Sequence, residues 1–277
     1  MYLMGMKTIS QPLLSTEEVA EYNREGFLVY NKPVFPVDEF EALKKHFEQL
    51  LDQWPKEERP ESMDVPHLTD TELFRWALSD SILDLVEPIL GPDILLFSTH
   101  FICKPKGDGR RVPWHEDSAY WRDMLDPMEV VTVWLALDPS LEENGCMKVV
   151  PGTHMKGKKG FSDYEDVDTN KNVLNQEIIK LRDKDCAENE VLCELQPNEC
   201  SLHDSRLIHG SIPNTSNIRR CGWTLRFARG DVKLNPELAD QHNMYLARGR
   251  NLTGQPLADP TRSYPELLEG RKSRRGH

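Results

Sequence analysis

Two short stretches of the chain carry residue types that could bind a metal ion. The first is Val112–Trp121, with the sequence VPWHEDSAYW. On an extended strand, residues i and i+2 project from the same face, so His115 and Asp117 would point together while Glu116 points away. An imidazole and a carboxylate on one face are two of the ligands that a divalent metal ion requires.

A third ligand must come from elsewhere, and the stretch 201–211, SLHDSRLIHGS, offers His209 and His203. On one continuous strand both histidines would face the same side. Either histidine could therefore complete the set with His115 and Asp117. Two histidines and one carboxylate form a facial triad, which leaves three positions open on Fe(II) for a bidentate cosubstrate and dioxygen. The same ligands also suit Zn²⁺ or Mn²⁺ in a hydrolase or in a non-catalytic cupin-like binding protein.

The segment after His209 favours a site with a cosubstrate. It reads HGSIPNTSNIRR, so Arg220 follows the histidine by eleven residues and begins the next predicted strand. This spacing favours Arg220 over its neighbour Arg219 as the guanidinium held near the metal. A bidentate arginine suits a dicarboxylate cosubstrate, which a metal-dependent hydrolase would not need.

The first third of the chain predicts helices that could support such a site. Residues 15–18, STEE, form a capping box, and apolar residues recur at helical spacing over 40–54. A second helical pattern begins at Thr69 and continues to Leu90, where Gly and Pro follow. We therefore expect a mainly helical scaffold over residues 15–93.

From residue 94 the pattern changes to short β-type runs separated by Pro and Gly turns, which is typical of a jelly roll. We expect an α+β protein with a double-stranded β-helix (jelly roll, cupin-like) core over 94–250 and N-terminal flanking helices. A polar tail over 251–277 would complete a single domain spanning 1–277. Residues 156–186 are highly charged, and we interpret them as a long mobile insertion.

The composition excludes several classes of protein. The 277 residues carry 34 Lys and Arg against 46 Asp and Glu, a net charge of −12, and so lack the broad positive field that nucleic-acid binders use. No apolar run approaches the ~18–20 residues of a membrane span, and no secretory signal is evident. Six cysteines without a CxxC pair indicate reduced thiols. We therefore expect a cytoplasmic protein with no nucleic-acid or membrane partner.

Over residues 15–250 the chain resembles the phytanoyl-CoA dioxygenase-like Fe(II)/2-oxoglutarate oxygenases. The resemblance rests on four segments that occur in the family's order: GFLV at 26–29, WHEDSAYW at 114–121, VTVWLALDPSLEENGCMKVVPGTH at 131–154 and HGSIPNTSNIRR at 209–220. It implies a jelly-roll enzyme that uses Fe(II) and 2-oxoglutarate, with dioxygen and a small molecule as the other reaction partners.

The resemblance also implies roles for individual residues. His115, Asp117 and His209 would bind iron, because the family uses the histidine that begins HGS and not the position of His203. Five residues would contact the cosubstrate: Arg220 with Ser211 on its distal carboxylate, Trp134 along its pocket, and Thr132 and His100 as further contacts. Some members of the family use a lysine well upstream of the HxD motif for the cosubstrate, and the region 61–67 offers no counterpart.

The reaction implied is hydroxylation of an unactivated C–H bond, with 2-oxoglutarate converted to succinate and CO₂. Halogenation is disfavoured because halogenating members carry a small residue at the position of Asp117. Four basic residues before the motif could attract an anionic substrate, although a solvated loop is the favoured interpretation: Lys104, Lys106, Arg110 and Arg111.

Three stretches are similar to the bacterial branch that hydroxylates aminoalkylphosphonates, such as 2-aminoethylphosphonate or its N-methylated forms: MDVPH at 63–67, HFICKPKGDG at 100–109 and WHEDSAYW at 114–121. We therefore expect a small polar substrate of this class. Other small zwitterions, secondary metabolites and acyl thioesters are the alternatives.

Overall fold

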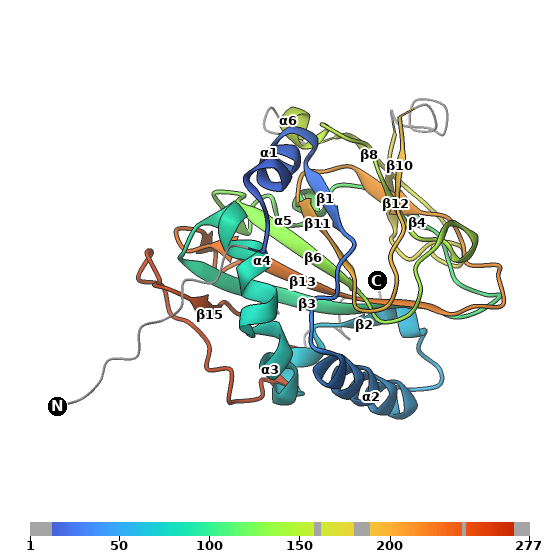
Figure 1. Cartoon of the computed structure of the whole chain (residues 1–277), viewed down its shortest axis with the longest axis horizontal. Coiled ribbons are helices and arrows are strands. Elements are labelled where there is room, and N and C mark those ends of the chain that lie inside the picture. Colours follow the sequence, from blue (N-terminus) through green and yellow to red (C-terminus); the bar gives the residue numbers. More distant parts are fainter. Residues whose placement is uncertain (1–12, 158–161, 180–188, 240–241, 269–277) are drawn as a thin grey trace.

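The computed structural model describes residues 13–157, 162–179, 189–239 and 242–268 of the chain. Its larger antiparallel sheet has the strand order β1 (Phe27–Tyr30), β11 (Cys200–Asp204), β6 (Val130–Ala136), β13 (Arg220–Arg229), β3 (Ile94–Lys104) and β15 (Tyr245–Arg248), and β2 (Met63–Asp64) also pairs with β3. A smaller sheet lies against it (Figure 1), in the order β10 (Val191–Cys193), β7 (Met147–Val149), β12 (His209–Ser211) and β4 (Val112–His115). This is the α+β architecture with a jelly-roll core that the sequence predicts.

Helices from the first third of the chain cover the other face of the larger sheet. They are α1 (Thr16–Glu25), α2 (Val37–Gln53), α3 (Phe74–Ala77) and α4 (Asp80–Leu90). The predicted capping box is present, because Ser15 accepts a hydrogen bond from Glu18 N and Glu18 accepts one from Ser15 N. Gly26 ends α1 with a φ of 82°, a conformation that glycine adopts without strain.

The helix predicted over residues 69–90 is interrupted. Residues 71–73 form a 3₁₀ turn and α3 is short. Ser79 then has an extended backbone, and its hydroxyl donates to Trp76 O at 2.8 Å. The serine side chain thus satisfies a carbonyl at the end of α3, and a separate helix, α4, begins after it.

The larger sheet separates the core from the space between the sheets, as β13 shows. Alternate residues of β13 are buried in the core beneath the helices: Cys221, Trp223, Leu225 and Phe227. The residues between them face the smaller sheet: Arg220, Gly222, Thr224 and Arg226. Polar and charged side chains therefore line the inner face of the larger sheet.

The strand predicted over residues 200–209 is two strands in different sheets. β11 ends at Asp204, and β12 begins at His209. The Asp204 carboxylate accepts hydrogen bonds from the backbone N and the guanidinium of Arg206, which closes the turn. The prediction that His203 and His209 share one strand face is therefore wrong, because the chain passes from one sheet to the other between them.

Part of the predicted mobile insertion is a packed hairpin, in which β8 (Tyr164–Asp166) pairs with β9 (Gln176–Ile178). Tyr164 and Ile178, one from each strand, pack with Trp114 of β4. The hairpin therefore belongs to the wall of the smaller sheet. Residues 158–161 and 180–186 of the insertion, which include Cys186, lie outside the described residues.

The described part of the predicted polar tail packs against the body of the protein. Tyr264 N donates to Leu68 O at 2.6 Å, and the Tyr264 ring lies 6.4 Å from that of Tyr245. The basic cluster of the tail lies beyond residue 268, outside the described residues. Among the helices described, none has the length and apolar character of a membrane span.

Candidate metal centre

The three predicted ligands meet between the two sheets. His115 ends β4 and lies opposite His209, the first residue of β12, in the antiparallel pairing. The sequence predicts Asp117 on the same strand as His115, and this is wrong. Asp117 instead begins the short helix α5 (Asp117–Trp121). Because Glu116 keeps an extended backbone, with a φ of −111°, the side chains of His115 and Asp117 still point to one side. One ligand atom from each of the three buried residues lies within 4.8 Å of the others.

The hydrogen bonds of both imidazoles leave one nitrogen of each free to bind a metal. His115 Nδ1 lies 2.8 Å from Pro113 O, and His209 Nδ1 lies 2.9 Å from Leu207 O. A carbonyl oxygen only accepts, so each Nδ1 carries a proton, and in the neutral form of each ring Nε2 presents a lone pair. His115 Nε2 lies 3.6 Å from Asp117 Oδ1. Two neutral imidazoles and one carboxylate fit Fe(II).

The charges around the triad favour these protonation states. Burial opposes the charged form of Asp117, but Arg226, whose Nε lies 3.4 Å from Asp117 Oδ2, and the two histidines hold the pKa of this carboxyl well below its usual range. Burial, with the neighbouring His115 and His203, holds the pKa of His209 well below that of a free imidazole. At neutral pH the site therefore presents a carboxylate and a neutral imidazole, the forms that bind metal.

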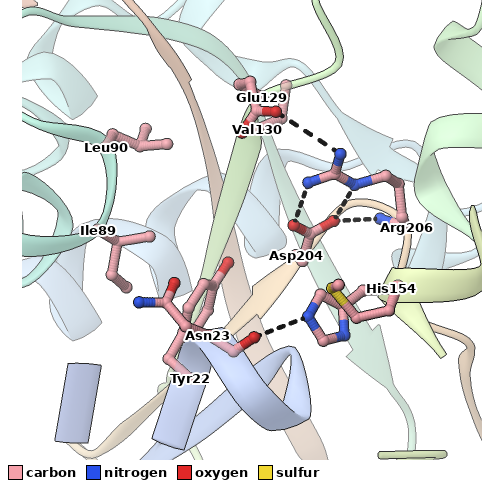
Figure 2. Close-up of a pocket in the computed structure, with 10 residues that line it drawn as sticks. Tyr22, Asn23, Ile89, Leu90, Glu129, Val130, His154, Asp204 and Arg206 are labelled. Carbon is pink, nitrogen blue, oxygen red and sulfur yellow. Dashed lines mark hydrogen bonds and ion pairs between the residues drawn. The ribbon is translucent and has the colours of Figure 1, made fainter. Parts of the chain in front are cut away.

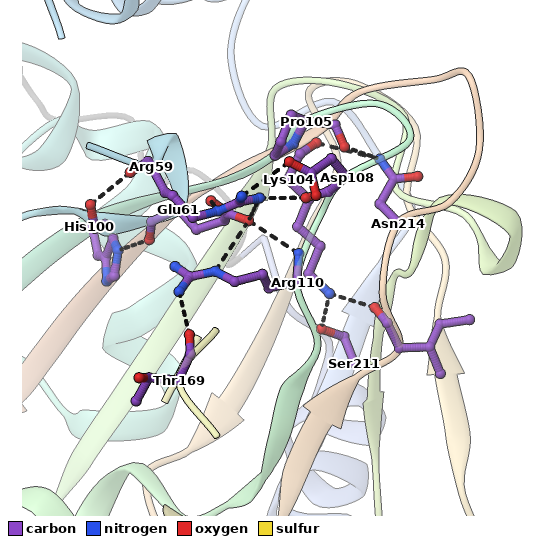
Figure 3. Close-up of polar contacts among 12 residues, drawn as sticks. Arg59, Glu61, His100, Lys104, Pro105, Asp108, Arg110, Thr169, Ser211 and Asn214 are labelled. Atoms are coloured by element: carbon purple, nitrogen blue, oxygen red, sulfur yellow. Dashed lines mark hydrogen bonds and ion pairs between the residues drawn. The ribbon is translucent and has the colours of Figure 1, made fainter. Parts of the chain in front are cut away.

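Two buried cations, Lys104 and Arg220, form a second part of the site, and Figure 3 shows the contacts of Lys104. Lys104 and Arg220 lie opposite each other in the pairing of β3 with β13. Lys104 Nζ donates to Ser211 Oγ and to Ile212 O, both at 2.6 Å, and Arg220 donates to Gly145 O at 3.0 Å. Within the part of the chain that the structure describes, neither cation forms an ion pair with a carboxylate, and Arg220 Nε has no hydrogen-bond partner.

Such a pair of cations favours an anionic ligand. Burial and the neighbouring Arg220 hold the pKa of Lys104 well below its usual value, and burial lowers the pKa of Arg220 to about 10. Buried charges without partners are unfavourable, and a carboxylate placed between them would satisfy both. The distal carboxylate of 2-oxoglutarate fits this pair.

Lys104 is a site residue that the sequence did not reveal as one. Read as part of a basic loop, it is instead the last residue of β3 and fully buried. Its separation from His100 and Ile102 by even numbers of residues places all three on the inner face of the sheet. This alternation along β3 was the sequence feature that could have placed Lys104 in the site.

Trp134 of β6 lies beside Arg220, and its predicted place along the cosubstrate pocket stays a prediction. The Arg220 guanidinium lies over the Trp134 ring, 4.8 Å from its centroid. A Cβ atom at Gly222 would lie 2.2 Å from the same ring. The absence of a side chain at Gly222 therefore allows the indole to lie flat on β13 and support the guanidinium.

His100 and the predicted basic loop are engaged with other protein groups (Figure 3). His100 Nε2 lies 2.8 Å from Glu61 O, and Nδ1 lies 3.7 Å from Asp64 Oδ1. The buried carboxylate of Glu61 accepts from the guanidinium of Arg59 and from Arg110 N. The cosubstrate contact of His100 therefore stays a prediction.

The charges of the predicted loop are also engaged. Arg111 forms a two-point ion pair with Glu177 of the hairpin, and Arg110 donates to Thr169 O at 2.9 Å. The solvated-loop interpretation is therefore wrong for Lys104, Arg110 and Arg111, whereas Lys106 is exposed as it indicated. Arg111 is not a free positive charge.

Thr132 and His203 face the space between the sheets near the triad. Thr132 lies opposite Arg226 of β13 and His203 of β11. It therefore lies at the Asp117 end of the site, away from Arg220, and its contact with cosubstrate stays a prediction. His203 is not one of the three clustered ligands, although its ring lies 4.7 Å from that of His209.

A separate cavity of about 100 Å³ lies between α1, α4 and the turn after β11 (Figure 2). Its polar groups bind one another. Arg206 pairs with Asp204 and with Glu129, and His154 Nε2 lies 3.2 Å from Asn23 O. No member of the metal triad lines this cavity, and its contacts attach α1 to the sheets.

Comparisons with known proteins agree with this geometry. The family model for phytanoyl-CoA dioxygenase (PhyH) matches residues 22–222. Human peroxisomal phytanoyl-CoA dioxygenase is 27% identical over 249 residues, which cover 81% of this chain and 71% of that protein. A probable alpha-ketoglutarate-dependent hypophosphite dioxygenase of Stutzerimonas stutzeri is 32% identical over 170 residues, 60% of this chain and 56% of that protein.

The fold has relatives among solved structures. EctD from S. alaskensis, solved with 2-oxoglutarate and 5-hydroxyectoine, has a TM-score of 0.66 and 21% identity, and the match covers 83% of this chain and 81% of that one. At this identity the likeness concerns the fold, while the family follows from the sequence match. The chain belongs to the phytanoyl-CoA dioxygenase family and is an Fe(II)- and 2-oxoglutarate-dependent dioxygenase.

Proposed function

We propose that His115, Asp117 and His209 hold the iron and that Lys104 and Arg220 bind the distal carboxylate of 2-oxoglutarate. The observation that carries this proposal is the pair of buried cations without a carboxylate among the described residues. Lys104 also contacts the strand that carries His209, because its hydrogen-bond partner Ser211 lies two residues after His209 on β12. When bound, iron and 2-oxoglutarate supply the activation of dioxygen with which a C–H bond is hydroxylated.

The chain's own residues orient the cosubstrate. Ser211 and Lys104 would donate to one side of its distal carboxylate, and Arg220 would donate from the other. Trp134 forms the wall beneath Arg220. Asp117 would supply the third protein ligand, so the position that a halide would need on the metal is occupied by its carboxylate. This favours hydroxylation over halogenation.

We further propose that the substrate is a small polar molecule with an anionic group, such as 2-aminoethylphosphonate or its N-methylated forms. The S. stutzeri relative supports this, since the hypophosphite in its name is a small phosphorus oxyanion. The basic loop supports it less, because Arg111 is paired with Glu177. Arg226, beside Asp117, is a better placed cation.

An acyl thioester is the second candidate, because the match with human phytanoyl-CoA dioxygenase covers 81% of this chain. The two substrate classes are separated by turnover. Succinate formed from 2-oxoglutarate would be measured with 2-aminoethylphosphonate and with phytanoyl-CoA, each against a reaction without added substrate. Stimulation by the thioester alone would refute the phosphonate proposal.

The cosubstrate site is tested by titrating 2-oxoglutarate into the anaerobic Fe(II) protein and following the visible charge-transfer band of the chelated 2-oxo acid. We expect Arg220→Ala and Lys104→Ala each to lower the affinity for 2-oxoglutarate about tenfold to a hundredfold, the usual effect of removing a hydrogen bond to a charged group. The matched control is Arg219→Ala, because the adjacent Arg219 binds Glu48 and Asp138 instead.

Two results would refute the proposed function. One is the absence of the band in the wild-type protein loaded with Fe(II). The other is an equal loss of affinity in Arg219→Ala and Arg220→Ala, which would indicate general disturbance of the strand and not loss of a ligand for the carboxylate.

A further inference from the structure

Three polar side chains form a row across the inner face of the larger sheet, next to the metal triad. Arg226 of β13 lies opposite Thr132 of β6, which lies opposite His203 of β11. One end of the row touches the triad through Arg226 Nε, 3.4 Å from Asp117 Oδ2. The other end touches it through the ring of His203, whose centroid lies 4.7 Å from that of His209.

All three side chains are buried, and two of them carry a polar atom that the described residues do not satisfy. Thr132 is fully buried and His203 is 1% exposed, yet Thr132 Oγ1 and His203 Nδ1 have no hydrogen-bond partner among the described residues. Arg226 is 9% exposed, and its described contacts are the long one to Asp117 and the Trp121 ring, 5.4 Å from the guanidinium carbon. Nearly all buried polar groups in proteins are paired, so two unpaired ones on neighbouring strands, beside a guanidinium, indicate a ligand or ordered water.

The row is distinct from the pair of cations that would hold the cosubstrate. Arg226 and Arg220 are six residues apart on β13, about 20 Å along an extended strand. The triad lies next to Arg226, and the cosubstrate would extend from the metal toward Arg220. A group bound at the row would therefore lie beside the metal without displacing the distal carboxylate of 2-oxoglutarate.

We propose that Arg226, Thr132 and His203 form a subsite for the anionic head of the substrate, an oxyanion such as a phosphonate or a carboxylate. This inference rests on the proposed function, because it places the substrate beside the iron. The guanidinium supplies the charge, and the Thr132 hydroxyl and the His203 N–H donate to oxygens of the same group. The Thr132 side chain is thereby assigned to the substrate and not to the cosubstrate.

Thr132→Val is the decisive variant, because it replaces an unpaired hydroxyl by a methyl group of similar volume. If the hydroxyl binds no ligand, its removal leaves affinity unchanged and raises the melting temperature or leaves it unchanged. If it donates to the substrate, affinity falls. Ser140→Ala is the matched control, since Ser140 also carries an unpaired buried hydroxyl but lies on another part of the fold, where its backbone pairs with Leu195.

The measurement uses the anaerobic protein loaded with Fe(II) and 2-oxoglutarate, in which a bound substrate shifts the visible band. The probes are 2-aminoethylphosphonate and its carboxylate counterpart 3-aminopropanoate, which distinguish the two kinds of head group, and inorganic phosphate. We expect at least one probe to shift the band of the wild-type protein, and Thr132→Val to weaken that probe about tenfold. The band before addition of probe and the affinity for 2-oxoglutarate should stay unchanged in this variant.

Arg226→Lys gives a second test, because it keeps the charge near Asp117 but loses the planar guanidinium. We expect weaker probe binding with the 2-oxoglutarate band retained. The subsite is refuted if no probe shifts the wild-type band, or if Thr132→Val binds the probe as tightly as the wild type while gaining stability, the result expected for a row of ordered water. Loss of the 2-oxoglutarate band in the wild type would instead refute the proposed function.

Discussion

Gly222→Ala tests whether the floor of the cosubstrate pocket is built as described. The added Cβ atom would lie 2.2, 2.3 and 2.5 Å from three atoms of the Trp134 ring, well inside van der Waals contact. The ring is 2% exposed, so it has no solvent to swing into. The substitution must therefore displace either the indole or the strand that carries it.

The magnitude follows from this overlap. Overpacking of a buried site typically destabilises a protein by about 1–3 kcal/mol. For a chain of 277 residues, this corresponds to a melting temperature lower by about 2–5 °C. Because Arg220 lies over the same ring, displacement of the indole should also lower the affinity for 2-oxoglutarate. A loss of packing elsewhere in the core would leave this affinity unchanged.

The assay is a double-mutant cycle on melting temperature and on 2-oxoglutarate affinity. Phenylalanine at position 134 lacks the outer part of the indole that the new Cβ would meet, so Trp134→Phe should suppress the effect of Gly222→Ala on stability. Additive losses in the double variant, or a Gly222→Ala protein that melts with the wild type, would show that the ring does not pack on Gly222 as described.

Other predictions concern charge and anchoring. Burial lowers the pKa of Lys104 far below 10.5, so between the folded and the unfolded pKa the unfolded chain holds a proton that the folded apo-protein has lost. The stability of the apo-protein should therefore rise with pH between these two pKa values. Thermal melts of Lys104→Met at several pH values should show a smaller rise. The Glu116 carboxylate accepts from Ser162 N and Oγ at 3.3 and 3.1 Å, and Glu116→Ala should speed hydrogen exchange in β8 about tenfold, while equal exchange would contradict the anchoring role. Arg219→Ala should lower stability by about 1 kcal/mol or less, because its ion pairs are partly exposed, and chemical denaturation would detect a larger loss.

The metal triad could be predicted because its geometry is mostly local. His115 and Asp117 point to one side through the alternation of an extended backbone, and this holds even though α5 begins at Asp117, since Glu116 is still extended. His209 required only that a second strand lie beside β4. The strand pattern and the motif order were sufficient for both.

The features that the sequence did not reveal depend on contacts between distant segments. Lys104 is buried because β3 pairs with β13 and because its ammonium group donates to Ser211 of β12, and neither contact is encoded near residue 104. The separation of His203 from His209 depends on the Asp204–Arg206 turn. The sequence does not predict this turn, because β-forming residues lie on both sides of it. Local patterns predict which residues can form strands, but not which sheet each strand joins.

The register of β3 against β13 connects the core to the metal ligands. Ser98 lies opposite Arg226, but Leu96 lies opposite Phe227, so one extra residue, Phe97, is accommodated in β3 at this point. Bulges of this kind re-aim side chains near functional sites. The Phe97 ring packs edge-on against Trp121, with centroids 5.2 Å apart.

Trp121 is the last residue of α5, the helix that begins at Asp117, and the Arg226 guanidinium lies over its ring. A single irregularity in β3 thus fixes the helix that carries the metal-binding carboxylate and the arginine beside it. Because both depend on the same contact, a change at Phe97 should disturb Asp117 and Arg226 together. Asp117 and Arg226 are therefore positioned as one unit, although they lie on different parts of the chain.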